Sequence, residues 1–143
     1  MRNYSKRLCQ VHGDYHPWNI LFREGADFTV LDRSRGEWGE PADDVSSMSL
    51  NYLFFSLDCC GKVEPVFLDM FETFWKRYLK KTKDKEMLKV VAPFFAWRCL
   101  VLASPLWYPK LDDSIRRSLF NFIHNVLDQE EFNPYNVKVL LKG

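Results

Sequence analysis

The stretch that decides the fold of this 143-residue chain is His12 to Asn19, which reads HGDYHPWN. Asp32 follows Asn19 by thirteen positions and comes directly after the largely apolar run 28–31. A carboxylate such as that of Asp14 can accept a proton from a reacting group. Amide and carboxylate oxygens are the ligands that Mg²⁺ prefers in proteins. The sequence therefore predicts a general base at Asp14 and a magnesium site at Asn19 and Asp32.

A second motif, GEPADD, occupies residues 39–44. Together with HGDxHxxN and Leu31-Asp32, it resembles the signature of the aminoglycoside phosphotransferase and choline kinase family. The resemblance implies the C-terminal lobe of a protein-kinase-like fold. This lobe would be α+β and mainly α-helical, with a short β-hairpin that carries the catalytic and metal residues. The activity implied is transfer of the γ-phosphate of ATP, with Mg²⁺, to a hydroxyl group of a small molecule that Asp14 positions.

The resemblance also implies supporting residues around the catalytic loop. His12 would hydrogen-bond to backbone groups and hold Asp14, and His16 would support the same loop. Asp44 would accept hydrogen bonds from the loop backbone, and a carboxylate there suits the positive end of a helix dipole. Its neighbour Asp43 is expected to face solvent. A metal site formed by the two histidines is disfavoured because no third nitrogen or sulfur ligand is close in sequence.

Two arginines, Arg33 and Arg35, follow Asp32 at a place where the family often has an aromatic residue. They could contact phosphate or an acidic group of the substrate. They could instead pair with Glu37 and Glu40, and this second interpretation is favoured because surface ion pairs need no ligand.

The segment 104–109, SPLWYP, joins the last two expected helices. Related kinases build part of the acceptor site in this region. Trp107 and Tyr108 could stack on a sugar, cover a cation, or only pack against the protein. No general pattern in the sequence identifies the acceptor.

The periodicity of apolar residues predicts a strand-rich start and a helical body within one domain, residues 1–143. Three strands are expected, at 8–11, 20–22 and 28–31. Four helices are expected, at 42–57, 66–79, 84–103 and 113–127. Pro93 should start or kink the third helix, which is expected to be interior because it is apolar on nearly all sides from Val90. The resulting division is a catalytic loop and metal hairpin (9–45), a helical body (46–131) and a C-terminal tail (132–143).

Composition argues against nucleic acid and membrane partners. Twenty basic and 19 acidic residues leave a net charge of +1, which gives no field to attract nucleic acid. The basic run 76–85 ends an expected helix, where the helix dipole favours cations. No apolar run has the length of a membrane span. Four irregularly spaced cysteines without a CxxC pair favour reduced thiols and a cytoplasmic location.

The sequence contains no GxGxxG segment among its six glycines. Kinases use such a loop, with a lysine on a strand, to hold the nucleotide phosphates. Because the catalytic loop begins at His12, the N-terminal nucleotide-binding lobe is expected to be absent from this chain. Another chain or a homodimer could supply it. The alternative is a catalytically inactive remnant or interaction module of the same fold. A metallophosphoesterase, suggested by the DxH fragment at 14–16, is disfavoured because the chain lacks GNHE.

Overall fold

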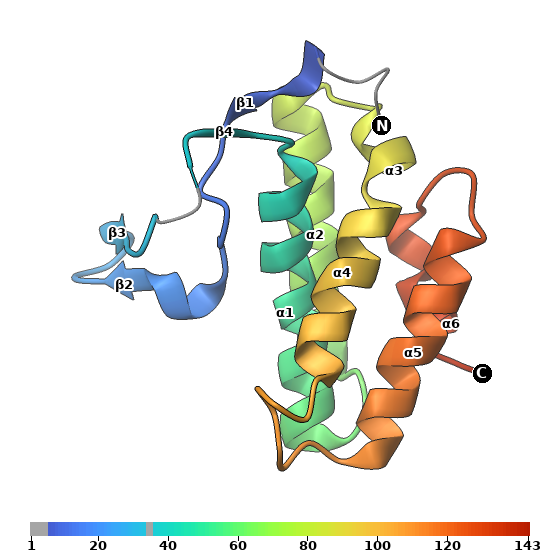
Figure 1. Cartoon of the computed structure of the whole chain (residues 1–143). Helices are drawn as coiled ribbons and strands as arrows, with labels where there is room; N and C mark the ends of the chain where they lie inside the picture. Colours follow the sequence, from blue (N-terminus) through green and yellow to red (C-terminus); the bar gives the residue numbers. More distant parts are fainter. Residues whose placement is uncertain (1–5, 34–35) are drawn as a thin grey trace.

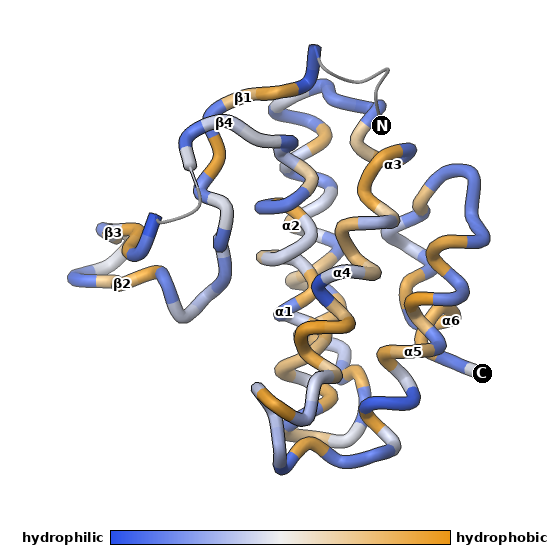
Figure 2. Tube along the Cα trace, viewed as in Figure 1, coloured by the Kyte–Doolittle hydropathy of each residue, from blue (hydrophilic) through white to orange (hydrophobic). Residues whose placement is uncertain are grey.

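The computed structural model describes residues 6–33 and 36–143. It is a mainly α-helical α+β fold. Helices α1, α2, α4 and α5 run side by side, and the β2–β3 hairpin lies apart from them on one side (Figure 1). Hydrophobic and hydrophilic positions alternate along α4 and α5, whereas the loop between α5 and α6 is hydrophilic (Figure 2). No helix in the described ranges is long and apolar enough to cross a membrane.

Within residues 6–33 and 36–143, four short strands form two separate antiparallel pairs. Strand β2 (Ile20–Phe22) pairs with β3 (Phe28–Val30), with Ile20 opposite Val30. The turn between them is closed by an ion pair of 2.6 Å between Arg23 and Asp27. This hairpin confirms the prediction.

The second pair joins β1 (Cys9–Gln10) to β4 (Trp38–Gly39). The sequence predicted β1 but not β4. A Cβ atom on Gly39 would lie 2.8 Å from Cγ2 of Val11, so a larger residue at the start of the GEP motif would force the side chain of Val11 to move.

Helix α1 (Ala42–Cys60) is the buried central helix that the sequence predicted, extended by three residues. It ends where Gly61 adopts a left-handed conformation (φ 69°) and its N–H donates to the carbonyl of Leu57. Helix α2 (Pro65–Thr82) packs against α1 and buries Phe71 and Trp75 completely.

The third predicted helix is two helices, α3 (Met87–Val90) and α4 (Ala92–Ala103), which meet at Val91. Pro93 lies at the start of α4, as expected for a residue without a backbone N–H. The expectation of an interior α4 is wrong in part. Trp97 and Leu100 are exposed, whereas the one charged side chain of the helix, Arg98, is buried.

Helix α5 (Asp113–Leu127) has the predicted bounds, and its cap, Asp112, accepts a hydrogen bond of 2.7 Å from the N–H of Ser114. The segment expected as a tail packs onto the helices through a 3-10 turn (Pro134–Asn136) and α6 (Val137–Leu140). Phe132 is buried, its ring centroid 4.9 Å from that of Phe95. The last residues therefore complete the core.

Candidate active site

The loop 11–16 is held in place by a carboxylate of α1. Asp44, in the first turn of α1, accepts hydrogen bonds from the backbone N–H groups of His12 (2.6 Å) and Gly13 (2.9 Å). Gly13 has φ 83°, a left-handed conformation that glycine adopts without strain. These are the backbone contacts that the sequence predicted for Asp44.

His12 joins the loop to the end of the hairpin. Its Nδ1 atom accepts a hydrogen bond of 3.3 Å from the backbone N–H of Asp14, and its Nε2 atom lies 2.7 Å from the carbonyl oxygen of Leu31. This pattern fits the neutral imidazole with its proton on Nε2. The predicted contacts of His12 with the backbone are therefore present.

Asp14 forms an ion pair with Arg98, a residue that the sequence analysis did not single out. The Nη1 atom of Arg98 donates to Oδ1 of Asp14 (2.9 Å), and Nη2 donates to Oδ1 of Asp43 (2.9 Å) and to the carbonyl of Gly13 (3.2 Å). Arg98 exposes only 7% of its surface. The expectation that Asp43 faces solvent is wrong in part: its side chain is 28% exposed, but it is also the second partner of the buried cation.

A sequence signal for Arg98 exists in hindsight. It is the only charged residue in the twelve-residue helix α4, and a buried arginine is nearly always paired with carboxylates. Which carboxylates it meets depends on how α4 packs against α1 and the loop, and no local pattern encodes that packing.

His16 lies near the carboxylate oxygen of Asp14 that Arg98 does not bind: its Nε2 atom is 3.6 Å from Oδ2. Burial lowers the pKa of His16, and the nearby cation of Arg98 adds to this, against the opposing effect of Asp14. The imidazole is therefore neutral at neutral pH. Its Nδ1 atom is buried and has no hydrogen-bond partner in the part of the chain that the structure describes.

Asn19 and Asp32 lie at adjacent ends of the hairpin. The backbone N–H of Leu31 donates to the carbonyl of Asn19 (2.8 Å), which brings Asp32 next to Asn19. The Nδ2 atom of Asn19 donates to the carbonyl of Asp14 (3.0 Å), so Oδ1 is the atom left for a cation. Asp32 is exposed and has φ 57°, a left-handed conformation that aspartate tolerates better than most residues.

These two oxygen donors fit Mg²⁺ bound together with a nucleotide. No cluster of three or more His, Cys, Asp or Glu side chains suitable for a metal occurs within residues 6–33 and 36–143. Mg²⁺ does not require one, because it usually takes one or two protein oxygens and fills its other positions with water and phosphate.

Arg33 donates to backbone carbonyls, those of Val11 (3.1 Å) and Glu37 (3.5 Å). Of the two carboxylates expected as partners of the arginines, Glu40 is bound by Arg7 at 2.8 Å, and Glu37 meets Arg33 through its backbone carbonyl. The ion pairing predicted for Arg33 is therefore wrong. The second arginine, Arg35, lies outside the described residues.

A cavity of about 640 Å³ lies beside Asp14, between the loop, α1, α4 and the segment 104–108. His16 and Arg98 line it, and so do both aromatic residues predicted as acceptor contacts, Trp107 and Tyr108. The sequence analysis did not single out Trp18 and Trp97, which also line this cavity.

The sequence of residues 2–83 matches the profile of the phosphotransferase enzyme family, and this match covers more than half of the chain. The chain belongs to the phosphotransferase enzyme family. Comparison with curated proteins gave no match, and comparison with solved structures gave none either. The matched part contains the loop, the hairpin and Asp44, whereas Arg98 and Trp107 lie beyond it.

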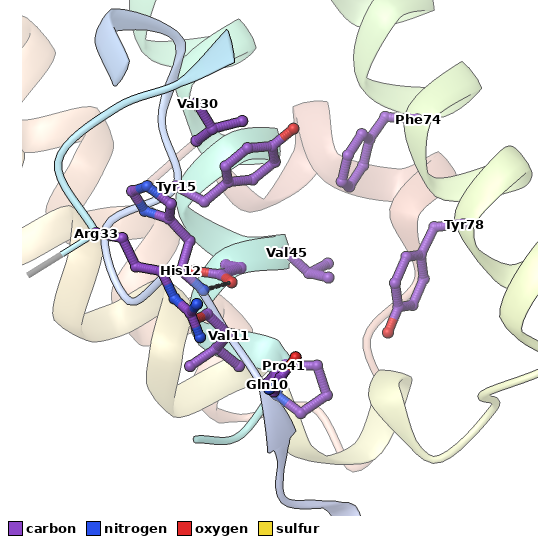
Figure 3. Close-up of a pocket in the computed structure, with 11 residues that line it drawn as sticks. Gln10, Val11, His12, Tyr15, Val30, Arg33, Pro41, Val45, Phe74 and Tyr78 are labelled. Carbon is purple, nitrogen blue, oxygen red and sulfur yellow. Dashed lines mark hydrogen bonds between the residues drawn. The ribbon is translucent and has the colours of Figure 1, made fainter. Parts of the chain in front are cut away.

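A second hollow in this phosphotransferase-family protein is a groove of about 470 Å³ on another side of the loop. Figure 3 shows Tyr15 and Val45 on one side of the groove and Phe74 and Tyr78 of α2 on the other. Asp14 does not line it. The larger cavity is therefore the one in which a substrate could reach the predicted base.

Proposed function

We propose that this chain is the base- and metal-bearing C-terminal lobe of a kinase-like enzyme. The enzyme would transfer the γ-phosphate of ATP, with Mg²⁺, to a hydroxyl group of a small molecule. One observation carries the proposal: Asp14 is held by Arg98 and opens onto a cavity of about 640 Å³, the size of a small-molecule site. Asn19, hydrogen-bonded to the carbonyl of the same residue, supports a cation site next to it.

In this proposal the acceptor enters the cavity with its hydroxyl group toward Asp14. The hydroxyl oxygen forms a bond to the γ-phosphorus as the bond between that phosphorus and the leaving ADP oxygen breaks, and Asp14 takes the hydroxyl proton. Arg98 lies 2.9 Å from one oxygen of the Asp14 carboxylate and His16 lies 3.6 Å from the other. These two neighbours restrict the rotation of the carboxylate. Asn19 and Asp32 would hold Mg²⁺, which neutralises phosphate charge when bound.

A second lobe is needed to cover the nucleotide in this proposal. The 143 residues contain no GxGxxG segment. We propose that another lobe, or a second copy of the chain, supplies that cover. Alone, the 143 residues should bind Mg²⁺-ATP only weakly, with a dissociation constant above about 1 mM, because few contacts with the nucleotide remain.

Paramagnetic broadening by Mn²⁺ and ATP in an NMR titration tests the metal site at such weak affinity. We expect the side-chain amide signals of Asn19 and the backbone amide signal of Asp32 to broaden before all others. Asp32→Asn should remove this broadening. Glu24→Gln, which neutralises an exposed carboxylate in the same hairpin, should leave it intact. Broadening that is centred elsewhere, or that survives Asp32→Asn, would contradict the proposed site.

A further inference from the structure

We propose that the cavity beside Asp14 binds an uncharged, ring-shaped compound with several hydroxyl groups, such as a neutral sugar or glycoside, as the acceptor. This inference rests on the proposed phosphotransferase function. It comes from three features of the cavity, namely its aromatic sides, its unpaired buried nitrogen atoms and its balance of charge.

Three tryptophans from different segments line the cavity: Trp18 after the catalytic loop, Trp97 on α4 and Trp107 in the following loop. Their exposed fractions are 69%, 56% and 67%. Indole rings are flat and largely apolar, so they pack well against the C–H faces of a saturated ring. Large aromatic side chains that remain exposed around one hollow are typical of a binding site.

Two buried nitrogen atoms on residues that line the cavity have no hydrogen-bond partner among the described residues: Nε of Arg98 and Nδ1 of His16. Leaving a buried polar group unpaired is unfavourable, so such groups are normally satisfied by a ligand or by water. Nε of Arg98 is a donor. Nε2 is the ring nitrogen of His16 closer to Asp14, at 3.6 Å from Oδ2, so in the neutral ring that carries its proton on Nε2 the Nδ1 atom is an acceptor. Both atoms are closed off from solvent by the surrounding side chains, so a hydroxyl group, which can donate and accept, reaches them only after a small movement of those side chains.

The charge of the cavity wall favours an uncharged ligand. Its described residues include one carboxylate, Asp14, and one guanidinium, Arg98, which are paired at 2.9 Å; Arg98 also pairs at 2.9 Å with Asp43, which does not line the cavity. An acceptor with several ammonium groups would find no further carboxylate in the described wall, and a buried charge needs a partner. A quaternary ammonium could lie over the indole rings, but it would also approach the guanidinium of Arg98.

Binding can be measured on the 143-residue chain through the indole N–H signals of its five tryptophans. The probes are methyl β-glucopyranoside, the methyl glycoside of glucosamine, which has the same ring with an ammonium group, and choline. We expect the glucoside to cause saturable shifts of the Trp97 and Trp107 signals. The signals of Trp75, which is buried in the core, and Trp38, which lies on β4, should stay in place.

Matched variants separate the cavity from the rest of the surface. Trp97→Ala should weaken glucoside binding several-fold, whereas Trp38→Ala removes an exposed indole outside the cavity and should not. Stronger binding of the amino sugar or of choline would overturn the inference. So would a glucoside titration that moves none of the five signals.

The titration needs neither nucleotide nor phosphate transfer, so its outcome is separate from that of the proposed function. Sugar binding without a metal–nucleotide site would support the sugar site itself and contradict the phosphotransferase proposal. Phosphate transfer to an amino or ammonium acceptor, without sugar binding, would support the phosphotransferase proposal and contradict the inference about the sugar.

Discussion

At the scale of single residues, the proposed base lies in the loop and the proposed metal ligands lie at the ends of the hairpin. Asp14 faces the cavity and is held by Arg98, whereas Asp32 lies exposed at the end of the hairpin. Neutralising a carboxylate that contacts the acceptor should lower the rate of transfer, whereas neutralising one that contacts the metal should weaken nucleotide binding.

We therefore predict different effects of Asp14→Asn and Asp32→Asn when a nucleotide-binding lobe completes the enzyme. Asp14→Asn should lower kcat by about 10²-fold or more, because a general base is lost, and leave nucleotide affinity nearly unchanged. Asp32→Asn should weaken Mg²⁺-dependent nucleotide binding. Steady-state kinetics with calorimetric titration of nucleotide measures both. An equal loss of nucleotide affinity in the two variants would show that the roles are wrongly divided.

His16 should make stability depend on pH. Its pKa is lowered in the folded chain, mainly by burial and also by Arg98, while Asp14 opposes the shift. In the unfolded chain a histidine takes up its proton near pH 6.5, about the ordinary value. The free energy of unfolding should therefore fall as the pH drops below about 6.5 toward the lower folded pKa.

Urea unfolding at pH 7.5 and pH 5 measures this effect. His16→Gln should reduce the difference between the two pH values. His124→Gln, which replaces an exposed histidine on α5, controls for the loss of a histidine as such. An unchanged pH dependence in His16→Gln would show that the neutral imidazole does not contribute.

At the scale of elements, strongly patterned segments followed the sequence and short or long-range features did not. Helix α5 was predicted with its bounds because its apolar residues recur at a period of 3.6, and the hairpin was predicted to within one residue because two short apolar runs flank the turn residues 23–27. Strand β4 has only two residues and exists through its pairing with β1, which lies far away in sequence. The partners of Arg98 were missed for a similar reason, since Arg98 lies 84 residues from Asp14 in the sequence.

One buried arginine ties the start of the chain to two helices. Arg7 donates to Glu40, just before α1, and to Asp84, just before α3, at distances of 2.8 and 2.5 Å. Its side chain is 7% exposed, and the ion pair holds the pKa of Asp84 below its ordinary value. The network should therefore stabilise the fold more than a surface ion pair does.

We predict that Arg7→Gln lowers the free energy of unfolding by about 2 kcal/mol or more, because two partly buried carboxylates lose their cation. The control is Arg23→Gln, which breaks the exposed pair with Asp27 and should cost less than about 1 kcal/mol. Urea unfolding of both variants at neutral pH gives the comparison. Equal effects would mean that burial adds nothing to the Arg7 network.

At the scale of the whole molecule, the strand segments lie beside the helical body (Figure 1), and several of their apolar side chains are exposed. Four of them are exposed on the hairpin and near it, namely Trp18, Leu21, Phe22 and Phe28. Phe22 and Phe28 also contact each other, with ring centroids 5.8 Å apart. Contiguous exposed apolar surface of this kind promotes association.

The purified chain should therefore self-associate through its first forty residues, with the strand edge near Cys9 as a pairing site. Sedimentation velocity at tens of micromolar measures this. Phe22→Ser with Phe28→Ser should shift the chain toward monomer. Tyr135→Ser, which removes an exposed aromatic ring in the segment after α5, should not. A strictly monomeric, folded wild-type chain would contradict the prediction.

The hairpin that carries Asn19 and Asp32 has strands of only three residues and pairs with no other strand of the described chain. An isolated two-stranded hairpin is barely stable in water, so its opening should need little free energy. Cation binding and closure of the hairpin are then linked, and each must favour the other by the same amount. We expect amide hydrogen exchange in residues 20–31 to slow when Mg²⁺ and ATP are added together, while exchange in the core of α1 stays the same. Mutations that stiffen the turn at 23–27 should in return raise the affinity for the cation.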